Sequence, residues 1–361
     1  MLFGASGYTG RLVAKALARD GVRFVLAGRN YQKLASLGVS LGHGLAVAVA
    51  DARRPESLLE LIQPDDVVIT TVGPYHRYGL PVAQAAVHRR ATYIDACAEP
   101  GFIRYVFEEL SPAAEAAGVA LLPACAYEYV AGNLAAAIAV EWLEELVQAV
   151  DVGYFLLGAA RGRISAGTRA SAAAAAYAPH FAFRDGAVQT VPAGDRVRRF
   201  DVDGRSRPGL AIGGEEHLTV PRLARSIRAV GVYAGGPRSS GAARVTARAL
   251  SAGARLPGFG RAAGWASRFR VGAEGPTAEA RARTVAEVVA RAYDDGGQEL
   301  RAVRLRVADP YAFSAEILAW AAQRVSREAP ACSGAVGPVE AFGLEPLREA
   351  CSAFGVTTIA G

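Results

Sequence analysis

The first 130 residues alternate short apolar runs with amphipathic stretches, and this alternation restricts the possible folds of the chain more than any other feature. Runs such as Val67–Thr71 are apolar on both faces of an extended strand, which is typical of a strand buried in a parallel sheet. The amphipathic stretches between such strands supply helices for both faces of that sheet. We therefore predict an α/β fold with a Rossmann-type, doubly wound parallel sheet.

The expected strands of this domain are Leu2–Phe3, Arg23–Ala27, Leu45–Ala50, Val67–Thr71, Thr92–Asp95 and Val119–Leu122. The expected helices are Gly10–Arg19, Tyr31–Leu37, Pro55–Ile62, Leu80–Arg89 and Tyr105–Ala117. The first strand is unusually short, because so few residues precede a glycine-rich turn. Either the natural start lies further upstream, or the central strand of the sheet has only these residues.

The rhythm changes after residue 130, where segments rich in glycine and arginine follow. Asp185-Gly186 and Asp203-Gly204 are dipeptides typical of tight hairpin turns. Val285–Tyr293 and Leu300–Val307 flank a third turn sequence and are expected to pair, although the first arm also has helical propensity. The other expected elements are a helix at Asn133–Val147, a strand at Val150–Leu157, and helices at Thr168–Tyr177 and Ser314–Arg327.

These segments predict a second, inserted α+β domain with a more antiparallel sheet. We place the Rossmann-type domain at residues 1–130 plus 310–361 and the inserted domain at residues 131–309. The inserted domain is expected to serve substrate binding or to form a homodimer.

Composition excludes several classes of protein. The net charge is +6, yet Lys15 and Lys33 are the only lysines and the arginines are scattered, so we expect no nucleic-acid partner. Four cysteines without a CxxC pair argue against a disulfide framework or a zinc site and indicate a reducing, cytoplasmic setting. The histidines have no metal-ligand spacing, so no metal is expected. The longest apolar stretch, Val119–Val140, contains a proline and Glu128, which argues against a membrane span.

The sharpest motif is Gly4-Ala5-Ser6-Gly7-Tyr8-Thr9-Gly10, which lies between an apolar strand and a helix. Glycines at this spacing allow a pyrophosphate to approach the backbone closely, and the amides at the start of the helix then face its charge. The residues expected to bind a dinucleotide are Gly4, Ser6, Gly7, Tyr8, Thr9 and Gly10. A plain tight turn is the alternative.

The end of the second strand indicates which dinucleotide is bound. NAD-selective sites place Asp or Glu about 20 residues after the glycines, whereas this chain has Gly28-Arg29-Asn30, with Lys33 one turn later. A carboxylate would repel a 2′-phosphate, and Arg29 can bind it with paired hydrogen bonds. We therefore expect NADP(H), bound by Arg29, Asn30 and Lys33. Asp51, at the end of the third strand, contacts the adenine side or caps the next helix.

Candidate catalytic groups follow the fourth and fifth strands. Gly73, Pro74 and Tyr75 lie where the fourth strand ends, and Gly73 would allow the backbone to approach a nicotinamide. Tyr75 could stack on that ring or donate its hydroxyl, and a structural aromatic is equally open. Asp95 could act as a general acid or orient a tyrosine, and a helix cap or an arginine partner is the alternative.

Other side chains on neighbouring loops could line a substrate site. The candidates are Tyr78, Glu99, Tyr127 and Glu128. Cys125 has no neighbouring histidine, so we interpret it as a packed structural cysteine.

Two segments resemble a known family. Thr71-Val72-Gly73-Pro74-Tyr75-His76-Arg77-Tyr78-Gly79 and Tyr93-Ile94-Asp95-Ala96-Cys97-Ala98-Glu99 are similar to signatures of the trans-acting enoyl reductase branch of the saccharopine dehydrogenase-like NADP-binding family. Cys97-Ala98 replaces the usual Thr-Gly of that branch. Further similarities are Ser165-Ala166-Gly167-Thr168 and Ala341-Phe342-Gly343-Leu344-Glu345-Pro346.

The resemblance implies NADP(H)-dependent reduction of an activated C=C in a polyketide or other acyl intermediate, free or bound to a carrier protein. It also implies a Rossmann domain interrupted by an α+β domain. A saccharopine-type C=N/C–N oxidoreductase is the alternative enzyme. A non-catalytic NADP-binding sensor or scaffold, or a redox-neutral cyclase, are alternatives of other classes.

Overall fold

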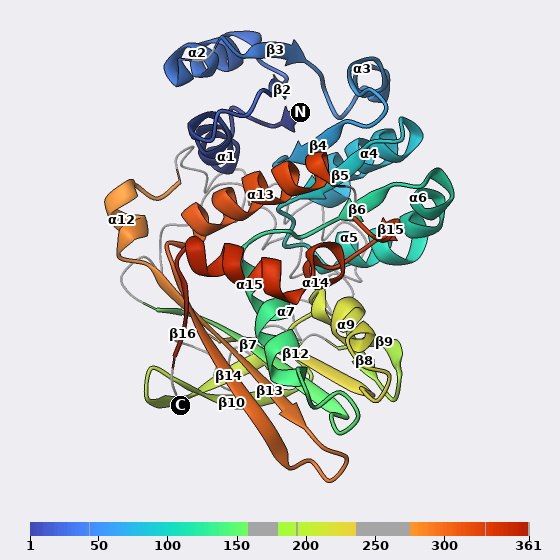
Figure 1. Ribbon diagram of the computed structural model, residues 1–361, viewed down its shortest axis with the longest axis vertical. Helices are drawn as coiled ribbons and strands as arrows, with labels where there is room; N and C mark the ends of the chain where they lie inside the picture. The colour runs from blue at the N-terminus through green and yellow to red at the C-terminus, as the bar shows by residue number, and fades with distance from the viewer. Residues whose placement is uncertain (43, 158–179, 193, 236–274, 329, 360–361) are drawn as a thin grey trace, which may run out of the picture. The chain divides into compact units, whose positions relative to one another are not determined.

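The computed structural model describes residues 1–42, 44–157, 180–192, 194–235, 275–328 and 330–359. The chain forms two compact units, each built on its own sheet (Figure 1). Unit 1 comprises Met1–Tyr127 and Tyr311–Gly343, and unit 2 comprises Glu128–Pro310 and Leu344–Gly361. The expected helix at Thr168–Tyr177 and the Ser165–Thr168 motif lie outside the described residues.

Unit 1 contains sheet A, which has seven strands in the order β15-β6-β5-β4-β1-β2-β3. The strands are β1 (Leu2–Phe3), β2 (Val25–Gly28), β3 (Ala46–Val49), β4 (Val67–Thr70), β5 (Thr92–Asp95), β6 (Ala120–Leu122) and β15 (Gly334–Ala335). Every neighbouring pair is parallel, which confirms the predicted fold class. The strand order reverses between β1 and β4, and the carboxyl ends of strands at such a reversal are where dinucleotides bind in this type of sheet.

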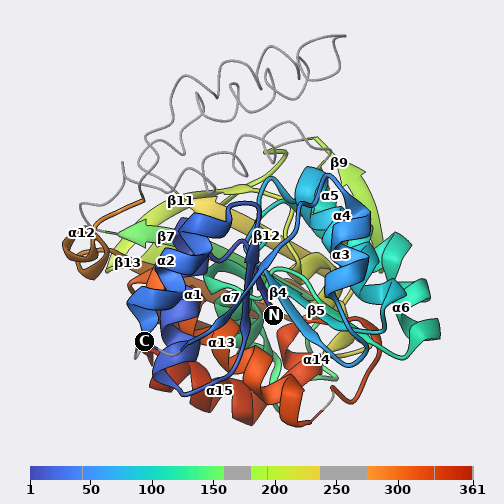
Figure 2. The ribbon, with the colours of Figure 1, turned by 90° about the horizontal axis from the view of Figure 1, so that it is seen from above.

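Unit 1 also contains helices. They are α1 (Tyr8–Arg19), α2 (Tyr31–Leu41), α3 (Pro55–Leu61), α4 (Tyr75–His88), α5 (Pro100–Tyr105), the π-helical turn η1 (Val106–Leu110), α6 (Ser111–Ala117), α13 (Pro310–Arg327) and α14 (Pro338–Phe342). Helix α1 contacts α2, and α4 contacts α3, α5 and α6 (Figures 1 and 2). Arg19 of α1 also makes a bidentate ion pair with Glu316 of α13, at 2.7 Å for each contact.

Some helix limits differ from those expected from sequence. Helix α4 begins at Tyr75 instead of Leu80, because a carboxylate distant in sequence accepts its first amides. Helix α7 covers Tyr127–Val140 instead of Asn133–Val147, and Trp142 just beyond its end adopts a left-handed φ of 67°. Among the described residues, no helix has both the length and the apolar character needed to cross a bilayer.

Unit 2 contains sheet B, in which nine strands are mostly antiparallel. The strands are β7 (Ala149–Leu157), β8 (His180–Arg184), β9 (Ala187–Val191), β10 (Val197–Val202), β11 (Arg205–Ala211), β12 (Ala229–Gly235), β13 (Val285–Tyr293), β14 (Glu299–Ala308) and β16 (Val356–Thr358). The helices are α7, α9 (Glu216–Thr219), the 3₁₀ turn η2 (Val220–Arg222), α12 (Ala278–Ala282) and α15 (Leu344–Ala353). The β12–β7 pair is parallel, and the three hairpins expected from sequence are all present.

The C-terminal segment differs from the expected division of the chain. Residues 310–361 were expected to belong with the Rossmann-type domain, yet Leu344–Gly361 belongs to unit 2. Strand β16 pairs with β14, with Val356 opposite Val307, so main-chain hydrogen bonds hold this segment on sheet B. The segment between the two parts of unit 1 starts at Glu128 and ends at Pro310, where residues 131–309 were expected.

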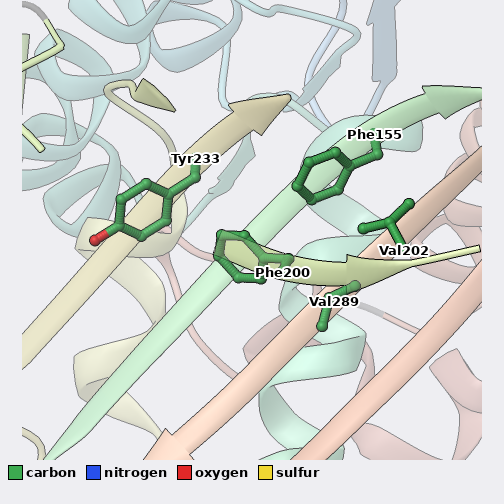
Figure 3. Packing of buried hydrophobic residues seen from close by; sticks show 5 residues of the cluster. All are labelled: Phe155, Phe200, Val202, Tyr233 and Val289. Atoms are coloured by element: carbon green, nitrogen blue, oxygen red, sulfur yellow. The ribbon is translucent and has the colours of Figure 1, made fainter. Parts of the chain in front are cut away.

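The core of unit 2 depends on the β10–β11 hairpin, whose turn residues Asp203 and Gly204 both have positive φ. Strand β10 lies across the neighbouring strands and directs two apolar side chains onto them (Figure 3). The Phe200 ring centroid lies 5.5 Å from those of both Phe155 and Tyr233. The buried cluster consists of Phe155, Phe200, Val202, Tyr233 and Val289.

Replacing Phe200 by Ala should lower the free energy of unfolding by about 3–5 kcal/mol, because the ring is 1% exposed and its removal leaves a cavity between three strands. Urea denaturation followed by circular dichroism measures this loss. Arg205→Ala, an exposed site at the same hairpin, is the matched control and should change stability by less than about 0.5 kcal/mol. Equal losses for both variants would contradict the packing role of the ring.

Candidate cofactor and active site

The glycine turn after β1 is closed so tightly that side chains cannot replace its glycines. Gly4 has a φ of 84°, and a Cβ there would lie 2.5 Å from Val72 Cγ2. A Cβ on Gly10 would lie 2.3 Å from the carbonyl oxygen of Gly4. The Gly4 amide donates to the Ala27 carbonyl at 2.8 Å, which ties the turn to β2. The turn therefore brings bare backbone to the point where the strand order reverses.

The N-terminus of α1 faces this turn with the properties of an anion site. Gly7 is the N-cap residue, no side chain caps the helix, and the first turn has no acidic residue. The amides of the first turn are consequently available to a pyrophosphate, and the helix dipole favours its charge. These residues fit the dinucleotide expected from sequence. The Tyr8 ring packs edge-on against Tyr311, with centroids 5.2 Å apart, so it also anchors α1 to α13.

Two exposed cations lie at the end of β2, as the sequence predicts for a 2′-phosphate site. Arg29 and Lys33 are both exposed. Asn30 has a different task, because its side-chain oxygen accepts the Lys33 amide at 2.9 Å and caps α2. Direct binding of cofactor by Asn30 stays a prediction, whereas its role in shaping the loop is visible.

Asp51 lies at the end of β3 and is paired with an arginine that sequence reasoning did not single out. The Arg53 guanidinium lies 2.6 Å from Asp51 Oδ2, and the Arg53 amide donates to Oδ1 at 3.0 Å. Hydrogen bonding from Arg53, with a smaller contribution from the charge of Arg29, lowers the pKa of Asp51 to about 2. Asp51 is not the cap of α3, since Arg54 occupies that position.

Arg53 adds a second guanidinium to the side of the site where Arg29 lies. The Arg53 side chain is 57% exposed, and Asp51 binds its guanidinium through Nε and Nη2, so the solvent side of the guanidinium can meet an anion. Tyr78 of α4 lies close enough to interact electrostatically with Arg53. Contact of Tyr78 with substrate stays a prediction. An arginine two residues after a strand-ending Asp was the available signal in the sequence.

Glu99 holds the start of α4 in place. Its side chain is 4% exposed, and its carboxylate accepts the Tyr75 amide at 2.8 Å and the His76 amide at 3.1 Å. The same carboxylate lies 2.9 Å from His76 Nδ1. A carboxylate at this position accepts hydrogen bonds from amides that have no partner within the helix, and its charge complements the helix dipole. Glu99, expected from sequence to line a substrate site, is therefore a helix-capping residue in the structure.

The environment of Tyr75 favours a structural role for its ring, which the sequence left open beside stacking and proton donation. Its ring is 5% exposed and packs against Phe102, with centroids 5.8 Å apart. Its hydroxyl lies 3.4 Å from the Thr70 carbonyl oxygen, inside the unit. Burial raises the pKa of this phenol well above its usual value. Tyr75 therefore fills the space beneath the Gly73-Pro74 loop, and any proton donation by its hydroxyl would require movement.

Asp95 is completely buried, and protein groups already occupy its carboxylate. Tyr93 donates its hydroxyl to Oδ2 at 2.6 Å, and the amides of Cys97 and Ala124 donate to Oδ1 at 2.8 Å each. Burial raises the pKa of Asp95 to about 6. Asp95 thus ties together the loops that follow β5 and β6. This arrangement favours a positioning role over contact with a reacting atom.

The thiol of Cys97 takes the place of a hydroxyl in the same loop. Its sulfur accepts the Glu99 amide at 3.1 Å and is buried. The Cys97-Ala98 substitution therefore keeps a side-chain acceptor in the turn that positions Glu99.

The residues that follow β6 belong to a separate part of the site. Cys125 is buried and donates its amide to the Asp95 carbonyl at 2.8 Å, as expected for a packed cysteine. The Tyr127 amide donates to Ser314 Oγ at 3.1 Å, and its ring is buried. Glu128 is exposed in the first turn of α7. Contact of Tyr127 and Glu128 with substrate stays a prediction.

Replacing Arg29 by Ala should raise the Kd for NADPH by about 10- to 100-fold, because a charge-assisted pair of hydrogen bonds is lost. The Kd for NADH should change by less than about 3-fold, since NADH has no 2′-phosphate. Fluorescence titration with each cofactor measures both constants. Arg23→Ala, exposed before the amino end of β2, is the control. Equal losses for NADPH and NADH in Arg29→Ala would refute the assignment.

Asp95→Asn should remove a pH dependence of stability that the wild type shows. The folded pKa of about 6 exceeds the ordinary value of 3.8, so protonation of Asp95 stabilises the fold. This stabilisation is complete below about pH 4 and is lost as the pH rises through about 6. Relative to Asp95→Asn, the wild type should therefore lose about 3 kcal/mol across that interval. Denaturant unfolding of both proteins at each pH tests this, and a constant difference would contradict it.

Comparisons with known proteins agree with this geometry. Residues 1–122 match the family described as the saccharopine dehydrogenase NADP binding domain. Trans-acting enoyl reductases of Mycobacterium bovis and Mycobacterium leprae are 34% and 35% identical to the chain over 139 residues. These matches cover 37% of this chain and 33% of each relative, so they span about a third of the length of those proteins.

A solved structure is similar over nearly the whole chain. The apo saccharopine dehydrogenase (L-Glu forming) of Saccharomyces cerevisiae superimposes with a TM-score of 0.62 and covers 99% of both chains at 13% identity. At that identity the likeness shows the fold alone. The resemblance inferred from the motifs is confirmed over residues 1–122, which match the NADP-binding domain described for the saccharopine dehydrogenase family.

Proposed function

We propose that the protein is an NADPH-dependent reductase that reduces an activated C=C in an acyl substrate. The observation that carries the proposal is the anion site at the strand reversal, where the open amides of α1 adjoin the cations Arg29 and Arg53. This combination suits a dinucleotide with a 2′-phosphate. The names of the mycobacterial relatives support enoyl reduction as the reaction.

Bound NADPH would supply the hydride, and the chain's own residues would orient it. The first-turn amides of α1 would bind the pyrophosphate, and the guanidinium of Arg29 would bind the 2′-phosphate. Glu99 holds the start of α4, so the preceding Gly73-Pro74 loop stays beside the glycine turn. We further propose that the substrate is a polyketide or related acyl intermediate, presented free or on a carrier protein.

The second candidate is a saccharopine-type oxidoreductase, which the similarity of fold suggests. A substrate with several carboxylates would need cations directed at the nicotinamide. Arg104 is instead paired with Glu108 at 2.8 Å, and the Arg77 guanidinium lies over the Tyr78 ring at 5.1 Å. These partners make enoyl reduction the better supported of the two reactions.

Purified protein mixed with NADPH and enoyl thioesters should oxidise the cofactor, followed as a loss of absorbance in the reduced-nicotinamide band. A parallel panel of imines and of keto acids with amines tests the second candidate. Cofactor binding is measured separately by fluorescence. Turnover of imines alone would favour saccharopine-type chemistry. Tight NADPH binding without turnover in either panel would favour a non-catalytic NADP-binding role, and absence of NADPH binding would overturn the site.

A further inference from the structure

His76 is the second residue of α4 and lies at the carboxyl end of β4, beside the strand reversal. Thr71, directly after β4, contacts the glycine turn, with its Oγ1 3.2 Å from the Gly4 carbonyl oxygen. A side chain that projects from the start of α4 is therefore close to the place where the nicotinamide half of a dinucleotide would lie. From sequence, His76 is the histidine that falls in the presumed site, and a surface-loop role is the favoured interpretation.

The two edges of the His76 ring have opposite surroundings. Nδ1 lies 2.9 Å from Glu99 Oε2, and the Glu99 side chain is 4% exposed. The His76 side chain is 60% exposed, and within the described part of the chain Nε2 makes no hydrogen bond. A buried carboxylate thus fixes the orientation of the ring and leaves the Nε2 edge accessible. This is the arrangement that orients a histidine for proton transfer.

The charges around the ring favour its protonated form. The hydrogen bond that His76 donates to Glu99 raises the pKa of His76, while desolvation and the positive charge of Arg77 lower it. The N-terminus of α4 also opposes a cation at this position. Glu99 outweighs these effects, so the net direction is upward. The raised pKa favours the protonated ring, and its exposed Nε2 edge can exchange a proton with solvent.

The other proton donors near this edge are poorly placed. The Tyr75 hydroxyl points toward the Thr70 carbonyl, and the ring is buried. The Asp95 carboxylate accepts three hydrogen bonds and has no exposed surface. Of the three candidate donors, His76 alone combines a titratable nitrogen, a fixed orientation and access to solvent.

We propose that His76, oriented by Glu99, is the proton donor that completes the reduction. The proposal rests on the proposed function. Hydride addition at the β-carbon of the enoyl group breaks the C=C π bond and leaves its electron pair as an enolate on the substrate. The α-carbon then takes the proton from Nε2, and the electron pair of that N–H bond stays on the imidazole. Neutral His76 regains a proton from solvent, so NADPH and one proton are consumed for each saturated product.

The test compares the wild type with His76→Gln, Glu99→Gln and the control His88→Gln, an exposed histidine at the other end of α4. His76→Gln should lower kcat for enoyl reduction by about 10²-fold or more. Its Kd for NADPH and its KM should stay within about 3-fold of the wild-type values. His88→Gln should match the wild type in all three quantities.

A second measurement needs neither cofactor nor turnover. The protein without cofactor is labelled at histidine, and the NMR signal that is missing from the spectrum of His76→Gln is assigned to His76. Titration of that signal in the other proteins gives the pKa of His76. That pKa should lie above the ordinary value of 6.5 in the wild type and fall in Glu99→Gln. The alkaline limb of the kcat profile should move to lower pH in Glu99→Gln by a similar amount. Urea denaturation checks that both variants are folded.

The outcomes separate the two proposals. If the wild type reduces enoyl thioesters and His76→Gln retains kcat within about 3-fold, the proton-donor role is wrong and the proposed function stands. An unchanged pKa of His76 in Glu99→Gln would overturn the orienting role of the carboxylate. If the wild type binds NADPH but reduces no enoyl thioester, the proposed function fails and the donor role fails with it.

Discussion

A buried carboxylate that accepts hydrogen bonds from the start of a helix organises the site of this protein. Glu99 receives the amides of Tyr75 and His76, and these residues directly follow the Gly73-Pro74 loop. Without that acceptor, two amides at the start of α4 would lose their partner, and the loop beside the glycine turn would lose its support. Both the loop that a cofactor would approach and the orientation of the His76 ring depend on the Glu99 carboxylate.

The site divides electrostatically along the edge of sheet A. At the ends of β2 and β3, Arg29 and Arg53 gather positive charge, which suits a phosphate. At the ends of β4 and β5, the carboxylates of Glu99 and Asp95 are buried and engaged with donors from the chain. One half is therefore built to bind an anion through exposed cations, and the other half is built to be rigid. Such a division suits a dinucleotide, because phosphates bound at one end of the site position the nicotinamide ring at the other end.

Much of the fold could be predicted, because its signals are local. The alternation of apolar and amphipathic segments follows directly from burial of a parallel sheet, and positive φ at Asp203-Gly204 follows from hairpin geometry. The start of α4 and the destination of β16 could not be predicted in the same way. Glu99 is separated from Tyr75 by 24 residues, and β16 pairs with β14, although helices and another strand lie between them in the sequence.

The roles of candidate site residues show the same limit. Spacing identified Tyr75, Asp95 and Glu99 as belonging to one edge of the sheet, and the structure brings them there. Their roles depend on which donor each carboxylate meets and on how much solvent remains, and these depend on chain segments far apart. Asp95, for example, has one partner on its own strand and another in the loop after β6.

The sequence by itself determined the succession of strands and helices along the first domain, the glycine turn and the preference for a cofactor with a 2′-phosphate, because each depends on residue type at short spacing. Only the tertiary structure decided that Arg53 joins Arg29, that Glu99 caps α4, and that the C-terminal strand belongs to the second sheet. The physical reason is that hydrogen bonds and ion pairs between distant segments form only after the chain has packed, and no local pattern encodes them.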